Sequence, residues 1–222
     1  MVRVILTGLL IGFGLVVAPT AAADPPTCPP TCDRIPAAAW PDPWSIPLNG
    51  TYRWPVLANV AIPGQATRFR FEEFCNAPRP FGDPRDYAVS ARAVVAQPVG
   101  QWQLQAQVLH WRGETWRGGQ LAAQVFDTAV AALRNCQLGA PQYSPSITTD
   151  TPNRVAAVIS GPQIVHQYLI ADPDNSTLSE LALWTTPGPA GVPQVPWPVI
   201  ADEQVFDAMA APLCAAYLGS CG

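Results

Sequence analysis

Two neighbouring segments of this chain alternate apolar and polar side chains in a way that fixes how they pair. The segments are residues 87–96 and 102–112, separated by the turn 98–101, and the pattern matches when Ala91 lies opposite Val108. One face then collects Val89, Ala91, Ala93, Val95, Trp102, Leu104, Ala106, Val108 and His110. A period of two that agrees on both segments predicts an antiparallel hairpin with one buried face.

The sequence predicts three further strands and two helices. Residues 154–160, 164–171 and 177–184 are apolar runs separated by turn residues, which predicts a meander. Apolar residues at near four-residue spacing predict one helix over 120–135, after Gly118-Gly119, and another from Glu203 to about Leu218. We expect Asp202 to cap the second helix and Pro212 to kink it.

This order of elements predicts one α+β domain over residues 67–222. We expect an antiparallel sheet of about five strands, formed by the hairpin and the meander, with the two main helices packed on one face. Residues 24–66 are rich in proline and contain Trp40, Trp44 and Trp54. They predict an irregular arm laid across the domain, because proline removes hydrogen-bond donors while tryptophan favours burial. Exposed tryptophans that bind a glycan or peptide remain the alternative.

The first 23 residues read as a signal peptide. Arg3 precedes an apolar run from Val4 to Val17, and Ala21-Ala22-Ala23 predicts cleavage before Asp24. An uncleaved anchor is the rival interpretation, but the run is short against the roughly 20 residues that a membrane span needs. No lipobox surrounds Cys28, so we expect no lipid anchor and a soluble mature chain that is secreted, periplasmic or held in the cell wall.

Export would place the chain in an oxidising compartment, which favours disulfide bonds between its six cysteines. Spacing prefers the pairs Cys28–Cys32, Cys75–Cys136 and Cys214–Cys221, although fifteen connectivities are open. The middle pair closes the longest loop and is expected to stabilise the fold most, by about 4 kcal/mol. Cys28 and Cys32 have a redox or copper-binding alternative, but they lie among prolines with no predicted helix, which favours a structural role.

Composition excludes two classes of protein. The chain has 16 acidic and 12 basic residues, all of the latter arginine, and a formal net charge of −4. Binding to nucleic acid requires a basic surface, so no nucleic-acid partner is expected. The sequence is 49% hydrophobic and 13% charged, which is too apolar for a disordered chain.

Candidate catalytic groups are few. His110 and His166 lack the spacing of zinc ligands, so no metal or cofactor is expected, although a buried or cleft-lining histidine that titrates near neutral pH is an alternative. Nucleophilic serine motifs are absent. The adjacent Glu72 and Glu73 would point to opposite faces of a strand. Glu180 lies in an apolar strand, where we expect it to face Gln167 as part of a polar sheet face.

The stretch 111–119 repeats a Trp-Arg-Gly unit. Arg112 and Arg117 in a loop that enters a helix could hold an anion, and Trp111 and Trp116 could add a flat apolar surface. We therefore place a candidate ligand site at the end of the hairpin. Its members are His110, Trp111, Arg112, Trp116 and Arg117, with His166 and Glu180 as further candidates. The alternative is that these residues seal the hairpin against the helix.

Several of these features together resemble a known family. They are the signal peptide, Cys75, the hairpin, a helix that ends in a cysteine (Ala129–Cys136) and the apolar strands that follow. Over roughly residues 70–218 the chain resembles the PknH-like extracellular sensor domains of mycobacteria. The resemblance implies an antiparallel sheet with helices, structural disulfides and a ligand cleft. The chain departs from it in lacking a cysteine in 164–171 and in carrying Cys214 and Cys221.

Three classes of function follow from these observations. A secreted binding or sensor-like module of the cell envelope, without catalytic machinery, agrees with the motifs and with the resemblance; its partner would be an unidentified envelope ligand or protein. A secreted hydrolase with an unrecognised acid or histidine site is the alternative. A purely structural role for the Pro/Trp-rich arm is the third.

Overall fold

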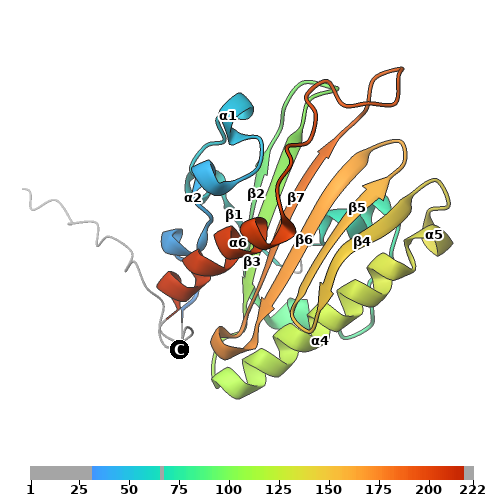
Figure 1. Cartoon of the computed structure of the whole chain (residues 1–222). Helices are drawn as coiled ribbons and strands as arrows, with labels where there is room; N and C mark the ends of the chain where they lie inside the picture. Colours follow the sequence, from blue (N-terminus) through green and yellow to red (C-terminus); the bar gives the residue numbers. More distant parts are fainter. Residues whose placement is uncertain (1–31, 66–67, 218–222) are drawn as a thin grey trace, which may run out of the picture.

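A seven-stranded antiparallel sheet organises the part of the chain that the computed structural model describes, residues 32–65 and 68–217 (Figure 1). The strands are β1 (Ile62–Gly64), β2 (Val89–Val95), β3 (Gln103–His110), β4 (Ser144–Thr151), β5 (Arg154–Ser160), β6 (Ile164–Asp172) and β7 (Thr177–Thr185). Their order across the sheet is β1-β2-β3-β7-β6-β5-β4. The predicted signal peptide lies outside the described residues.

The register of the hairpin is confirmed. Ala91 pairs with Val108 and Val95 with Leu104 along β2 and β3. The meander is also confirmed as β5, β6 and β7, but its register differs from the prediction by two residues. Glu180 pairs with Leu169, while Gln167 pairs with Ala182.

The prediction of about five strands missed both edges of the sheet. β4 joins β5 along its length, and only Ile147 of its residues is a large apolar side chain. β1 is three residues long and adds to β2. Both are edge strands, which bury little and therefore carry a weak alternating pattern.

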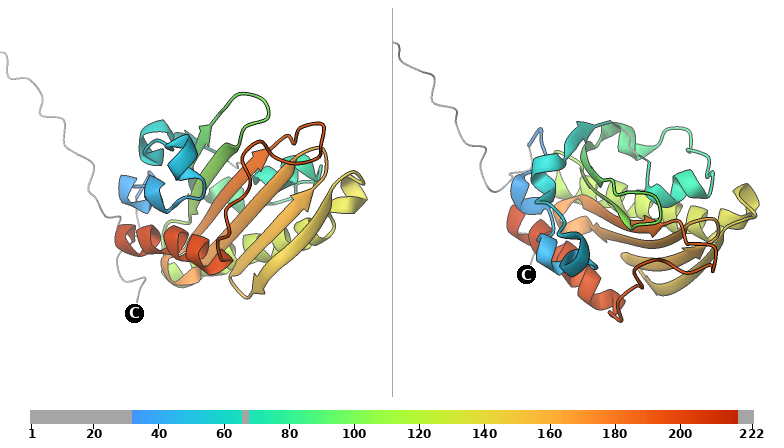
Figure 2. Two further views of the ribbon diagram at one scale, coloured as in Figure 1. Left: turned by 45° about the horizontal axis from the view of Figure 1, so that its top comes forward. Right: turned by 90° about the horizontal axis from the view of Figure 1, so that it is seen from above.

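The two long helices lie on opposite faces of the sheet, so the prediction that both pack on one face is wrong. Figure 2 shows α4 (Thr115–Arg134) on one side and α6 (Asp202–Ala216) on the other. One core cluster joins α4 to Val165 and Leu169, and the other joins α6 to Tyr168 and Ile170. Successive residues of β6 point to opposite faces, and both faces are covered.

Both helices begin differently from the prediction. Gly118 and Gly119 lie inside α4, where an added Cβ would come within 2.5 Å of Ser176 Oγ and 2.4 Å of the Pro173 carbonyl oxygen. These glycines let the helix approach the β6–β7 connection closely. Asp202 is not the cap of α6, because Ala201 occupies that position. Asp202 instead accepts a hydrogen bond of 2.7 Å from Thr149 Oγ1.

The arm packs on the α6 face of the sheet and contains short regular elements, against the prediction of irregular structure. They are η1 (Ala37–Ala39), η2 (Pro43–Ser45), α1 (Asn49–Tyr52) and α2 (Leu57–Val60). Trp40 and Trp54 are buried in the same core cluster as α6, whereas Trp44 is 83% exposed. Among the tryptophans of the described arm, Trp44 alone is therefore open to a glycan or peptide.

The predicted disulfide Cys75–Cys136 is present. It joins the end of α3 (Arg70–Phe74) to α5 (Cys136–Gly139). Cys32 and Cys214 are also disulfide-bonded, but the predicted pairs Cys28–Cys32 and Cys214–Cys221 each include a residue outside the described part. The remaining elements are η3 (Pro84–Tyr87) and η4 (Pro173–Asn175). Within residues 32–65 and 68–217, no helix is long and apolar enough to cross a membrane.

Candidate functional site

An apolar groove runs between the arm and the β1–β2 edge of the sheet. We call it the arm groove, and its volume is about 620 Å³. Its lining residues come from the arm, from the segment between α2 and β1, and from β2: Cys32, Asp33, Arg34, Ile35, Pro36, Ala37, Ala38, Trp40, Ala58, Ala61, Pro63, Val89, Ser90 and Ala91. A cavity of this size and character is typical of small-molecule sites.

Charged residues belong to the part of the groove formed by the start of the arm. Asp33 lines the groove and forms an exposed ion pair with Arg112, which directly follows the Trp111 that ends the hairpin. Arg34 lines it as well. The only other polar side chain of the lining is that of Ser90, and its hydroxyl donates to the Gly64 carbonyl. The groove therefore offers an apolar surface with charges gathered in one segment.

His110 lies beside this groove but does not titrate near neutral pH. It pairs with the groove residue Val89, is buried, and stacks on Tyr217 with 4.6 Å between ring centroids. Burial lowers the pKa of His110 to about 4, against an opposing effect of the Asn175 and Ser176 backbone. Neither ring nitrogen has a hydrogen-bond partner of good geometry among the described residues.

The other predicted site residues at the hairpin end do not form one loop. Trp111 is buried, and its Nε1 donates to the Pro84 carbonyl at 2.9 Å. Trp116 and Arg117 are exposed in the first turn of α4, which begins at Thr115. Arg112 pairs with Asp33 instead of joining Arg117. The predicted loop that would hold an anion between the two arginines is therefore not formed, and Trp111 serves the packing of the hairpin.

His166 lies at the opposite end of the sheet from His110. Its ring stacks on Trp197 with 3.6 Å between centroids and an interplanar angle of 6°. Burial lowers its pKa to about 4. The lowered pKa values of both histidines do not favour the alternative of a histidine that titrates near neutral pH.

Glu180 is fully buried on the face of the sheet that α3 and α4 cover. Its Oε1 accepts hydrogen bonds from the Arg70 backbone nitrogen at 2.6 Å and from Gln167 Nε2 at 3.0 Å. Its Oε2 accepts from Gln105 Nε2 at 2.9 Å. The predicted contact with Gln167 is thus present, although it runs diagonally across the two strands. We call Glu180 and these three donors the amide cluster.

The amide cluster supplies no positive charge in direct contact with the carboxylate. Burial raises the pKa of Glu180 to about 7, although its three donors and the charge of Arg92 act in the opposite direction. The guanidinium of Arg70 stacks over Trp184 at 4.2 Å, and its Nη2 donates to Gln105 Oε1 at 3.0 Å. The predicted polar face of the sheet is therefore real at this position, but it is buried beneath α3 instead of exposed.

A second buried polar cluster was not predicted. Arg85 donates to Glu72 Oε2 at 2.7 Å and to Asp83 Oδ2 at 2.7 Å, and all three side chains are buried. We call it the ionic triad. Glu72 and Glu73 lie on α3 and not on a strand, so the strand-based prediction for them is wrong. The sequence signal was the run Asp83-Pro84-Arg85, in which an aspartate can cap a turn that begins with proline.

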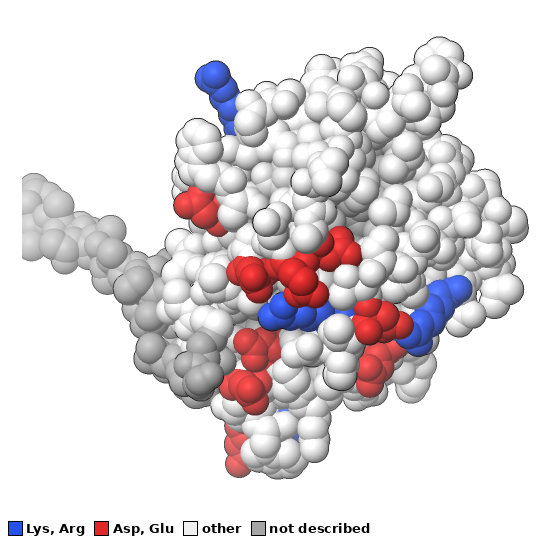
Figure 3. Space-filling model, viewed as in Figure 1, with Lys and Arg blue, Asp and Glu red and all other residues white. Residues whose placement is uncertain are grey.

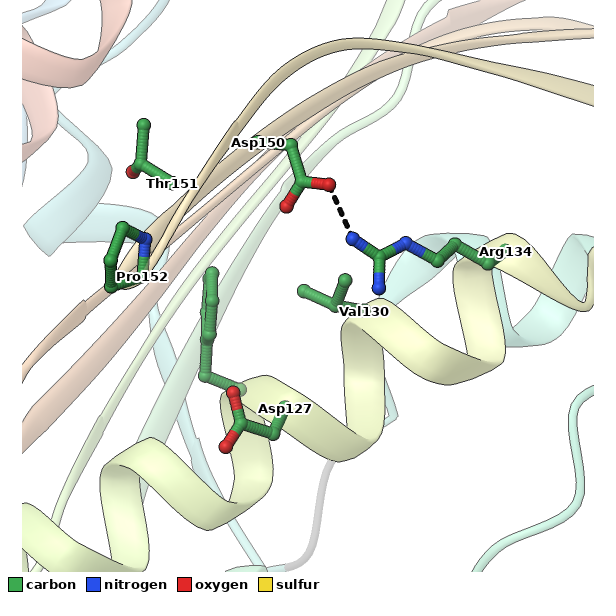
Figure 4. A pocket seen from close by; sticks show the side chains of 7 residues that line it. Asp127, Val130, Arg134, Asp150, Thr151 and Pro152 are labelled. Atoms are coloured by element: carbon green, nitrogen blue, oxygen red, sulfur yellow. Dashed lines mark hydrogen bonds and ion pairs between the residues drawn. The ribbon is translucent and has the colours of Figure 1, made fainter.

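A shallow depression of about 520 Å³ lies between α4 and the β4–β5 turn (Figure 4). Arg134 from the helix and Asp150 from the strand form an ion pair across it, and Asp127 lies two helical turns before Arg134. Both partners of the pair are about half exposed. Exposed ion pairs contribute little energy, and no group of three or more metal-ligating side chains occurs in the described residues.

Comparison with known proteins does not assign the chain to a family. No protein-family model matches the chain, and no curated protein matches it. The resemblance to PknH-like sensor domains therefore stays a prediction.

Proposed function

We propose that this protein is a non-catalytic binding module of the cell envelope, similar to a sensor domain, and that its ligand occupies the arm groove. The observation that carries the proposal is the groove itself, which has about 620 Å³ of mostly apolar space. Small-molecule sites are concave and mostly apolar, with a few polar groups that orient the ligand. Asp33, Arg34 and Arg112 are such groups.

The lining suggests the chemical class of the ligand. Most of the wall is aliphatic, from Ile35 to Ala38 at the start of the arm and from Ala58, Ala61 and Pro63 further along the chain, with Trp40 as the one aromatic ring. Such a surface fits an unbranched hydrocarbon chain. Arg34 and Arg112 lie at the charged part of the groove, and guanidinium groups bind anionic head groups well. The ligand class is therefore an aliphatic chain that carries an acidic head.

The hydrolase alternative has weaker support. Hydrolysis by an acid and a base needs both groups at one accessible site. Glu180 is fully buried beneath α3, whereas the two histidine rings pack against Tyr217 and Trp102 of the core cluster on the other face of the sheet. The described residues do not bring Glu180 and a histidine together.

Titration with dodecanoate and with dodecanol tests the proposal. We expect both compounds to raise the melting temperature of the chain that begins at Asp24, with the acid more effective than the alcohol. Ala61→Phe should abolish the shift, because Ala61 is half-buried in the groove wall and a larger side chain fills the space.

Ala123→Phe is the matched control, since Ala123 is half-buried on α4, far from the groove in the sequence and on the other face of the sheet. Ala61→Leu provides a milder version if the phenylalanine variant folds poorly. No shift with either compound, or a shift that Ala61→Phe and Ala123→Phe reduce equally, would contradict the proposed site.

A further inference from the structure

The connections at one end of the sheet carry no charged side chain. At this end β2, β5 and β7 finish and β3, β4 and β6 begin, so the connections 96–102, 140–143, 161–163 and 186–197 lie there. Asp, Glu, Lys and Arg are absent from 93–111, 135–149, 155–171 and 181–201. His166 is uncharged at neutral pH because burial lowers its pKa to about 4. We call the four connections the uncharged end.

The distribution of charge is visible on the surface. In Figure 3 most acidic and basic side chains gather across the middle and lower part of the molecule, a few lie at the upper left, and the upper right is free of them. The same region of Figure 1 holds the projecting connections that follow β2 and β7. Two arginines lie at the rim. Arg53 follows Tyr52, whose Oη accepts a hydrogen bond from the Trp102 nitrogen, and the guanidinium of Arg70 stacks over Trp184.

Two ordered turns at this end each present an exposed valine. Val99 is 91% exposed in a turn closed by the bond from the Gln101 nitrogen to the Pro98 carbonyl. Val192 is 61% exposed beside a turn in which the Gly191 nitrogen donates to the Gly188 carbonyl. The positive φ angles of Gly100 and Gly191 allow these tight turns.

The two valine-bearing connections lie side by side. Thr185 Oγ1 donates to the Gly100 carbonyl at 3.1 Å, and Trp102 Nε1 donates to the Val195 carbonyl at 2.7 Å. Trp184 and Trp197 are half-buried at the base of the same end. Tryptophan is enriched where proteins meet the interface between lipid and water.

We propose that the uncharged end docks on the surface of a lipid bilayer, with Val99 and Val192 inserted among the lipids. Projecting tips suit a bilayer, because lipids close around single side chains, whereas a protein partner needs a broad complementary face. No charged group of this end has to lose its hydration when the tips enter the lipid. Binding should therefore depend on apolar burial and not on lipid charge.

Co-sedimentation with phosphatidylcholine vesicles tests this proposal. The chain that begins at Asp24 is used, because the predicted signal peptide would bind lipid itself and every described helix and strand lies after residue 36. We expect binding that changes little from about 0.05 to about 0.5 M salt, since screening affects only charge interactions. Val99→Asp with Val192→Asp should weaken it at least about a hundredfold, because each buried valine is worth roughly a factor of ten.

The matched control is Val56→Asp with Ile62→Asp, which changes two aliphatic residues that are 53% and 71% exposed outside the uncharged end. This variant should bind like the unchanged chain. Failure of the unchanged chain to bind, equal losses in both double variants, or binding to anionic vesicles alone would overturn the proposal. So would a dimer that forms without lipid and that Val99→Asp with Val192→Asp dissociates, because the end would then be a contact between proteins.

Discussion

Asp83 and Glu180 are both buried carboxylates, yet their surroundings change their acidity in opposite directions. Asp83 is 2% exposed and Glu180 is 0% exposed. Burial alone would raise the pKa of Asp83, but hydrogen bonds and the charge of Arg85 overcome this and lower it. Glu180 receives hydrogen bonds from two glutamine amides and one backbone nitrogen, and its pKa rises to about 7. Asp83 faces the guanidinium of Arg85, whereas Glu180 lies deeper and receives hydrogen bonds only from uncharged donors, and both differences act in the same direction.

The ionic triad and the amide cluster should also differ in how they respond to the loss of a partner and to a change of pH. In the ionic triad, against the effect of burial, Arg85 lowers the pKa of Asp83, and hydrogen bonds to Asp83 and Glu72 raise the pKa of Arg85, so Asp83 and Arg85 keep their charges through the physiological range. The amide cluster holds one acid near the midpoint of its titration. Removing a partner should therefore damage the triad most, while a change of pH should affect the amide cluster most.

Arg85→Met should have the largest effect. The substitution leaves Glu72 and Asp83 buried without their cation, so we expect the free energy of unfolding to fall by about 3 to 5 kcal/mol at pH 7. Urea denaturation followed by circular dichroism measures it. A loss below about 1 kcal/mol would show that the triad is not the structural contact that its burial indicates.

Glu180 should make stability depend on pH in the opposite sense to most carboxylates. Its pKa rises from 4.5 to about 7 on folding, so the folded state binds more protons between these values. The stability contribution is complete below about pH 4.5 and is lost as the pH rises through about 7, by up to about 3 kcal/mol. Denaturation of the unchanged chain and of Glu180→Gln at pH 5 and pH 8 tests this, because glutamine cannot titrate.

The expected result is that Glu180→Gln gains stability relative to the unchanged chain as the pH rises. Asp83→Asn supplies the comparison. Asp83 has a lowered pKa, so its contribution is present above the unfolded value of 3.8 and is lost as the pH falls through its folded pKa. The deficit of Asp83→Asn should therefore shrink in acid. Parallel pH curves for Glu180→Gln and the unchanged chain would refute the assignment for Glu180.

Much of the sheet could be predicted, because β2 and β3 alternate with a period of two and their turn fixes the register. The arrangement of the helices could have been predicted as well. Apart from His166 and Gln167, β6 carries apolar or aromatic residues at successive positions from Ile164 to Ala171, which is the pattern of a strand covered on both faces. β4 could not be found in this way, since its residues are mostly exposed and Pro145 interrupts it.

The candidate site was much less predictable, because it depends on contacts between distant segments. The arm groove joins residues 32–40 to residues 58–63 and 89–91, and no local spacing reports that association. The ionic triad joins α3 to η3 in the same way. The predicted site near His110 stays a prediction, although His110 itself pairs with the groove residue Val89. The predicted loop that would hold an anion between Arg112 and Arg117 is not formed, because α4 begins at Thr115 and Arg117 therefore lies on a helix.

Substitution of Arg112 or Arg117 should have the smallest effect on stability, and only ligand binding should distinguish the two arginines. Arg112 forms an exposed ion pair beside the arm groove, and Arg117 is exposed on α4, so Arg112→Gln and Arg117→Gln should each change the free energy of unfolding by less than about 1 kcal/mol. Their effects on ligand binding should differ. Arg112→Gln should weaken the binding of dodecanoate several-fold and leave the binding of dodecanol unchanged, because only dodecanoate has an anionic head group that pairs with the arginine. Arg117→Gln should change neither, which makes it the matched control. Equal losses for both compounds in Arg112→Gln would mean that Arg112 shapes the groove, and a loss in Arg117→Gln would place the acidic head on α4 instead of at the arm.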